Sequence, residues 1–147
     1  MNKLRGTFTV MVTPFTPDEQ LDEKGFRQNI DWYIDAGIHG VICLGSTGEF
    51  ANLSIEERRL VIDLTVDQVK GRVPIIAGTA ANSTRETIAI TKYAEDAGAD
   101  AALIVTPYFL RPSNKEIYEH YEKIANGTEI PIFLYNIPQV TGVNLNW

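Results

Sequence analysis

Two hydroxyl side chains stand between two glycines in the segment Gly45-Ser46-Thr47-Gly48, which directly follows an apolar run of strand length. A tight glycine-rich turn exposes successive backbone N–H groups as an anion-binding nest, and the hydroxyls of Ser46 and Thr47 add two further donors. Such a turn is suited to a small carboxylate. The alternative is a strand-to-helix turn whose hydroxyls satisfy only their own backbone, and the spacing alone does not choose between the two interpretations.

Two further side chains are of types that could do chemistry. Tyr135 ends a later apolar run, where its phenol could donate or relay a proton or could pack as an amphipathic ring. Cys43 is the only cysteine and lies inside an apolar run. We therefore expect a buried, unreactive thiol there rather than a nucleophile.

Neither a metal ion nor another cofactor is expected. The two histidines, His39 and His120, lie far apart in the sequence, and neither C-x-x-C nor H-E-x-x-H occurs. The glycine turn lacks the Gly-Lys-Ser/Thr of a P-loop, and it is not the G-x-G-x-x-G of a dinucleotide-binding turn. We expect His39 to enter a strand and His120 to lie on a solvent-exposed helix face.

The composition excludes several classes of protein. Hydrophobic residues make up 44% of the 147 residues, as in ordinary globular proteins. The 13 Lys and Arg residues against 19 Asp and Glu residues give a net charge of −6, and no basic stripe offers itself to nucleic acid. The longest apolar run, 101–105, cannot span a bilayer, and the N-terminus lacks the apolar segment of a secretory signal. We expect a cytoplasmic protein that binds neither nucleic acid nor membranes.

One structural unit repeats along the chain. Apolar runs of strand length alternate with segments of helical periodicity, and three of these segments open with Ser-x-x-Glu, the pattern of a capping box. The expected strands are 8–12, 40–44, 73–77, 101–105 and 131–135. The expected capping serines are Ser54, Ser83 and Ser113, and the expected terminal glycines are Gly37, Gly71, Gly98 and Gly127.

This order predicts a parallel sheet, for which two architectures remain open. A five-stranded doubly wound sheet would be complete at this length. A (β/α)8 barrel would not, because strand starts about 31 residues apart extrapolate to about 250 residues for eight units. The sequence stops just after the fifth run, which we interpret as a fragment of a barrel. In a barrel we expect the inward side chains to be Val10, Val12, Ile42, Leu44, Ile75, Ile104 and Leu134, although alternation leaves the register open.

The segments that follow the runs resemble, in order, those of the dihydrodipicolinate synthase/N-acetylneuraminate lyase family of pyruvate-handling aldolases. Each segment alone is a weak signal, but the ordered set is specific and extends over nearly the whole chain. The matching segments are Val12-Thr13-Pro14-Phe15, Gly45-Ser46-Thr47-Gly48-Glu49, Ile76-Ala77-Gly78-Thr79, Val105-Thr106-Pro107-Tyr108, Arg111-Pro112, Tyr135-Asn136-Ile137-Pro138 and Thr141-Gly142.

The resemblance implies a (β/α)8 barrel and a lyase mechanism. In this family a lysine near the end of strand six forms a Schiff base with pyruvate, and the resulting enamine adds to an aldehyde. Gly45, Ser46 and Thr47 would hold the pyruvate carboxylate, while Tyr135 and Ser46 would be catalytic, Tyr135 as a proton relay. On this basis residues 1–147 form the N-terminal portion of one barrel domain, with the lysine outside the chain and the chain alone inactive.

Two positions depart from the synthases of the family and concern the substrate. The loop after strand four commonly carries two tyrosines, the second reaching a neighbouring subunit, and here the second position is Phe109. An arginine that binds the carboxylate of aspartate semialdehyde is replaced by Val140. Both changes point away from aspartate semialdehyde as the substrate. The expected function is a synthase-like lyase, and the alternative is an aldolase for 2-keto-3-deoxy sugar acids or N-acetylneuraminate.

The partners implied by the resemblance are pyruvate or another 2-keto acid, an aldehyde, and further copies of the chain in a homotetramer or dimer. Two functions of other classes remain as alternatives. One is a complete doubly wound domain that binds a ligand or transmits a signal. The other is a non-catalytic half-barrel that self-associates.

Overall fold

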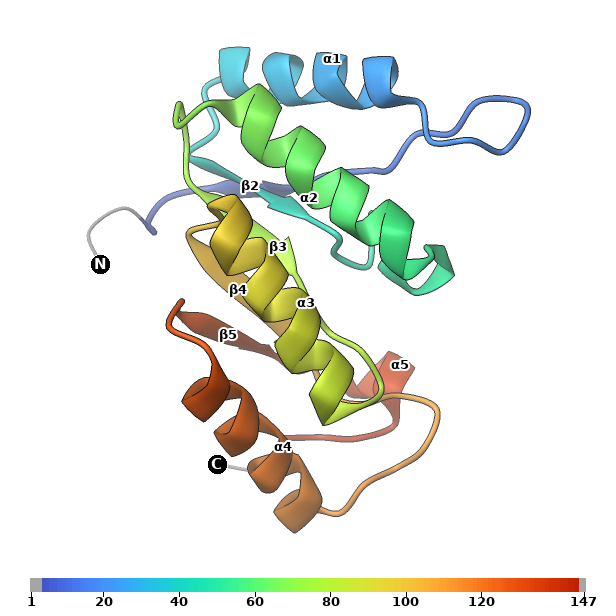
Figure 1. The fold of residues 1–147 in the computed structure, drawn as a ribbon, viewed down its shortest axis with the longest axis vertical. Coiled ribbons are helices and arrows are strands. Elements are labelled where there is room, and N and C mark those ends of the chain that lie inside the picture. Colours follow the sequence, from blue (N-terminus) through green and yellow to red (C-terminus); the bar gives the residue numbers. More distant parts are fainter. Residues whose placement is uncertain (1–3, 146–147) are drawn as a thin grey trace.

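The structure, a computed structural model, describes residues 4–145 as strands that alternate with helices (Figure 1). None of the helices in this part of the chain has the length and apolar character needed to cross a bilayer. The expected strands are all present, with ends that differ by about two residues at most. The strands are β1 (Phe8–Val10), β2 (Gly40–Cys43), β3 (Ile75–Gly78), β4 (Ala101–Val105) and β5 (Ile132–Tyr135). The helices are α1 (Glu23–Asp35), the 3₁₀ turn η1 (Phe50–Asn52), α2 (Ile55–Val69), α3 (Thr84–Ala97), α4 (Asn114–Gly127) and the short α5 (Pro138–Thr141).

The five strands are parallel and lie in the sheet in chain order, β1-β2-β3-β4-β5. A doubly wound sheet reverses its strand order at a switch point. Within residues 4–145 each new strand instead joins the same growing edge, as the strands of a barrel do. The doubly wound alternative is therefore wrong, and the chain forms the first five strands of a (β/α)8 barrel.

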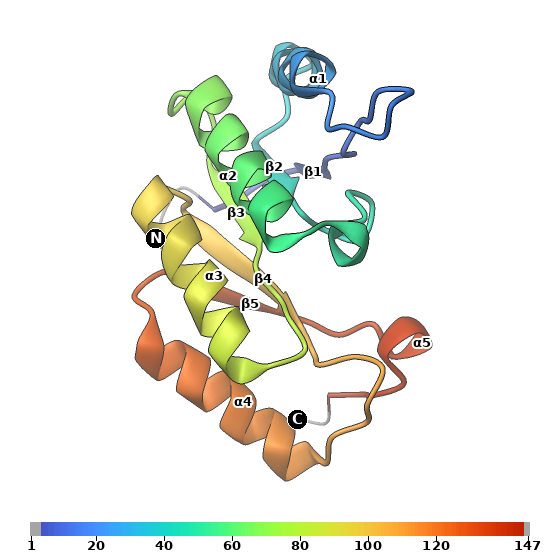
Figure 2. The same ribbon diagram turned by 45° about the vertical axis from the view of Figure 1, so that its right-hand side comes forward.

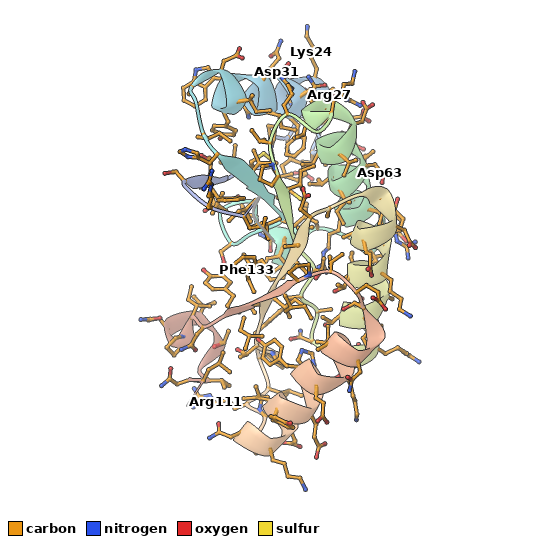
Figure 3. The ribbon with its side chains drawn as sticks, turned by 90° about the vertical axis from the view of Figure 1, so that its left-hand side faces the viewer. Lys24, Arg27, Asp31, Asp63, Arg111 and Phe133 are labelled. Carbon is orange, nitrogen blue, oxygen red and sulfur yellow. The ribbon has the colours of Figure 1, made fainter. Side chains whose placement is uncertain are left out.

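The two faces of the sheet differ in how they are covered. Helices α1 to α4 follow one another along one face (Figures 1 and 2), and that face shares a core with them that includes Val41, Cys43 and Ile75. On the other face, Val12 and Phe133 remain 41% and 42% exposed. Figure 3 shows Phe133 on the side of the sheet away from the helices. This open face corresponds to the interior of the barrel.

The register corrects three of the expected inward side chains. Ile75 belongs to the core shared with the helices, Ile104 is fully buried in a cluster with Ile124 of α4, and Leu134 lines a groove beside Ile117 of α4. Strands covered on both faces are apolar at nearly every position, so the sequence pattern does not show which side chains face the helices and which face the barrel interior. A shift of one residue exchanges the faces, which is why the prediction was wrong for these three side chains.

Helix starts follow local sequence signals closely. Ser54 and Ser113 each form a complete capping box with the glutamate three residues later. Ser83 accepts the N–H of Glu86, and no reciprocal bond from the Glu86 carboxylate is found at this cap among the described residues. Gly127 lies inside α4 rather than beyond its end, so its predicted role as a terminal glycine is wrong. These caps set where α2, α3 and α4 begin, and therefore where the loops that precede them end.

Candidate active site

The loops that follow the strands meet at one end of the sheet, where two of the predicted site residues come together. Ser46 follows β2 and Tyr135 ends β5, 89 residues later in the sequence. The Ser46 Oγ and Tyr135 Oη atoms lie 3.5 Å apart, at the outer limit of a hydrogen bond. Both side chains line a small cavity together with Gly45. The curvature of the sheet thus places a phenol next to the glycine turn.

The turn after β2 is strained and tied in place. Leu44 and Glu49, which flank it, have φ values of +57° and +53°, and each left-handed residue of this kind costs about 1–3 kcal/mol. The Gly48 N–H donates to the Gly45 carbonyl at 3.1 Å, and the Thr13 hydroxyl donates to the Gly48 carbonyl at 2.8 Å. Such strain persists only where the surroundings enforce it, and it concentrates at functional sites.

The end of β3 presses directly against this turn. A Cβ atom at Gly78 would lie 1.9 Å from the Leu44 carbonyl oxygen, so only glycine permits this approach. The contact brings the segment after β3, including Ala80, to the same cavity as Ser46. Gly78 is therefore part of the architecture of the site, although it carries no functional group.

The donors of the turn are available to a ligand. Ser46 and Thr47 are both exposed. Among residues 4–145, neither their N–H groups nor the Thr47 hydroxyl donates to another protein group, and the Ser46 hydroxyl contacts only Tyr135. The alternative in which both hydroxyls satisfy their own backbone finds no support in these contacts. The arrangement suits an anion about the size of a carboxylate.

Phe109 and Val140 lie in different surroundings. Val140 is 72% exposed and lines a depression of about 240 Å³ together with Ser46, Phe50 and Tyr108. Phe109 is 92% exposed, has a φ of +73°, and lines a separate depression together with residues of α3 and α4. Within one copy of the chain, Val140 is therefore a neighbour of Ser46, and Phe109 points elsewhere.

Three residues near the site were not predicted as functional residues. Phe50 and Tyr108 line the depression beside Ser46, with their rings edge to face at 6.0 Å. Arg58, on α2, is 6% exposed and lies 5.5 Å from the Phe50 ring. The position of Arg58 could have drawn attention in the sequence. It lies three residues before Val61 and therefore on the same apolar face of its helix, where a cation is unusual.

The sequence predicts a burial state for two side chains outside the site, namely Cys43 and His120. Cys43 is buried as expected, and burial raises the pKa of its thiol to about 11, so the thiol stays protonated at neutral pH. His120 is 4% exposed, and a hydrogen bond of 2.9 Å joins its Nδ1 to the Thr84 hydroxyl. The prediction that His120 lies on a solvent-exposed face was wrong, because α3 packs against that side of α4. In the described part of the chain, no three His, Cys, Asp or Glu side chains gather to hold a metal ion.

The fold and the site together define a class. A parallel barrel with a donor-rich glycine turn and a phenol at the carboxyl ends of its strands is typical of barrel enzymes that act on small molecules. Residues 3–147 match the model of the Dihydrodipicolinate synthetase family. The chain belongs to this family.

Two relatives illustrate the match in sequence. The chain is 46% identical over 144 residues to the 4-hydroxy-tetrahydrodipicolinate synthase of Methanothermobacter thermautotrophicus, covering 98% of the chain and 51% of the relative. It is 49% identical over 141 residues to the enzyme of that name from Thermodesulfovibrio yellowstonii, covering 96% of the chain and 48% of the relative. The chain thus spans about half the length of these curated relatives.

Solved structures agree with the fold. Dihydrodipicolinate synthase from Acinetobacter baumannii, in complex with pyruvate, superposes with a TM-score of 0.94 at 45% identity, covering 97% of this chain and 49% of that chain. YagE from E. coli K12, a family member also in complex with pyruvate, superposes with a TM-score of 0.93 at 38% identity, covering 96% and 47%. The barrel architecture is therefore that of these proteins.

Proposed function

We propose that the full-length protein is a pyruvate-dependent lyase of the aldolase type that acts through a lysine Schiff base. The observation that carries this proposal is the approach of the Ser46 and Tyr135 hydroxyls to 3.5 Å beside a turn whose N–H and hydroxyl donors are exposed. The pyruvate complexes of the Acinetobacter baumannii enzyme and of YagE, which share this fold, support the choice of substrate. The lysine belongs to residues beyond 147, which would complete the barrel.

Each site residue has a role in this proposal. The N–H groups and hydroxyls of Ser46 and Thr47, with Gly45 forming the turn, hold the pyruvate carboxylate and orient its ketone. The lysine amine adds to the ketone, and Tyr135 donates the proton with which the carbinolamine oxygen leaves as water. Loss of a C3 proton from the iminium gives the enamine, which adds to an aldehyde. Ser46 lies next to the phenol and passes the proton onward.

The identity of the aldehyde substrate is open between two reactions of the family. The relatives above are synthases by name, and a synthase-like reaction is the first candidate. A second candidate is a 2-keto-3-deoxy sugar acid or N-acetylneuraminate aldolase. It is favoured by Val140, which lies 72% exposed beside Ser46 where a charged aldehyde would need a cation.

A homotetramer or dimer in the cytoplasm completes the proposal. Phe109 is 92% exposed with a left-handed backbone, and Leu110 beside it is 74% exposed. Two adjacent large apolar side chains on a strained loop tip are costly to leave in water. We assign this loop tip to contact with a second copy of the chain, in which Phe109 reaches the neighbour's site.

The test is reduction with borohydride in the presence of pyruvate. Full-length protein that forms the Schiff base acquires a stable pyruvyl adduct on one lysine, which mass spectrometry locates. A matched reaction without pyruvate is the control. Absence of the adduct, together with an unperturbed fold, contradicts the proposed lyase function and would leave a non-catalytic role for the barrel.

A further inference from the structure

Arg58 is a buried cation that the reaction described above does not use. It lies on the face of α2 that also carries Val61 and Ile62, and it is 6% exposed. Burying a guanidinium costs several kcal/mol unless hydrogen bonds and charges compensate. Its Nη2 donates to the Ala80 carbonyl at 2.7 Å. Within residues 4–145 its Nε has no hydrogen-bond partner and it forms no ion pair, although the Glu86 carboxylate acts on its charge from a greater distance. The cost of burying this cation is therefore only partly compensated.

The guanidinium links three of the loops that build the site. Ala80 belongs to the segment after β3. The Phe50 ring, in the turn after β2, lies 5.5 Å from Arg58 Cζ, within the range of a cation–π interaction. The Phe50 ring in turn contacts the Tyr108 ring, in the loop after β4, edge to face at 6.0 Å. Arg58 thus contacts the loops after β2 and β3 directly, and the loop after β4 through the Phe50 ring.

The residues that Arg58 contacts are those that line the site. Ala80 and Phe50 line the small cavity that contains Ser46 and Tyr135. Phe50 and Tyr108 line the larger depression beside it. Arg58 itself lines neither space, so it can act on the site only through these neighbours.

We propose that Arg58 is a positioning residue, which holds the Ser46 turn against the loops after β3 and β4 and so sets the Ser46 hydroxyl at hydrogen-bonding distance from Tyr135. This inference rests on the proposed function. A planar guanidinium can donate to the Ala80 carbonyl at 2.7 Å while its carbon stays 5.5 Å from the centre of the Phe50 ring. An apolar side chain can do neither, and a lysine ammonium lacks the planar fork that fixes both contacts at once.

The test compares variants of the full-length protein by turnover per active site. Active sites are counted as the fraction of protein trapped by borohydride with saturating pyruvate when the trapping is carried to completion, so that slower Schiff-base formation does not lower the count. Arg58→Met keeps the length and apolar stem but removes the hydrogen bond and the charge, and we expect turnover per trapped site to fall about 10–100-fold. Arg58→Lys keeps the positive charge but lacks the planar guanidinium, and we expect turnover per trapped site to fall here as well.

The matched control is Arg59→Met. Arg59 is the next residue of α2 and also lies over an aromatic ring, that of Tyr93 at 5.1 Å, but it is exposed and remote from the site. We expect its turnover per trapped site to equal that of the wild type. If Arg58→Met does not fold, Phe50→Leu supplies the same test, because it removes the ring face while leaving the Arg58 bond to Ala80.

The outcomes separate this inference from the function on which it rests. A wild-type protein that traps no pyruvate overturns the proposed function, and the role of Arg58 with it. If the wild type traps pyruvate and Arg58→Met loses turnover only in proportion to trapped sites, Arg58 is merely structural and the inference is overturned. A loss per site that Arg58→Met and Phe50→Leu share, and that does not add in the double variant, supports it.

Discussion

The Tyr135 phenol offers the sharpest test of the site, because removing it should separate catalysis from stability. Tyr135→Phe deletes one oxygen and keeps the ring that packs beside Leu103 and Val105 at the strand ends. Among residues 4–145, the Ser46 hydroxyl at 3.5 Å is the one hydrogen-bonding group that this oxygen approaches. A bond of that length is weaker than an ordinary one, so the free energy of unfolding should fall by at most about 1 kcal/mol.

The effect on turnover should be much larger. A positioned proton donor contributes a factor of about 10²–10⁴, which corresponds to about 3–5.5 kcal/mol of transition-state stabilisation. The assay measures steady-state turnover, pyruvate affinity by calorimetric titration and thermal unfolding on one preparation of full-length protein. We expect turnover to fall by that factor while pyruvate is still bound and the melting temperature changes little.

A second tyrosine provides the control. The Tyr121 hydroxyl donates to the Ile104 carbonyl at 3.0 Å on the helix side of the sheet, away from Ser46. Tyr121→Phe removes the same atom and one hydrogen bond to a carbonyl of the sheet, so it should cost about 0.5–1.5 kcal/mol of stability and leave turnover unchanged. Equal losses in binding and turnover for Tyr135→Phe, or the same pattern in both variants, would refute the proton-relay role.

Four further predictions concern other parts of the molecule. Thr47→Val should weaken pyruvate binding by roughly 1.5–3 kcal/mol in a calorimetric titration, and unchanged affinity would remove Thr47 from the carboxylate site. Phe109→Tyr combined with Val140→Arg should raise activity towards aspartate semialdehyde, whereas no gain in the coupled assay would mean that these positions do not set specificity. Burial lowers the pKa of His120, so the folded state binds fewer protons than the unfolded state. Stability should therefore be constant above about pH 6.5, the pKa of a free histidine, and should fall as the pH drops below it, a slope that denaturant titrations should find reduced in His120→Gln. The isolated polypeptide 1–147, with unpaired edges at β1 and β5 and an open sheet face, should self-associate in light scattering and form no pyruvate adduct; a cooperatively melting monomer would contradict this.

Features that depend on neighbours along the chain could be predicted from the amino-acid sequence alone. Capping at Ser54 and Ser113 is a contact over three residues, and the alternation of apolar runs with helical periodicity is equally local. These signals were sufficient for the order of the elements and for the parallel sheet. The ordered set of strand-end segments was sufficient for the family.

Features that depend on packing between distant segments become visible only in the folded chain. The order of strands in space, which separates a doubly wound sheet from a barrel, is encoded by no local pattern. The family resemblance implied the barrel, and the strand order confirms it. Local patterns also do not encode which side chains of apolar strands such as β4 face the barrel interior. Nor do they encode the burial of Arg58 and His120 or the contact between Ser46 and Tyr135. These outcomes depend on packing between segments tens of residues apart, because the free energy of such contacts appears only once the helices have closed over the sheet.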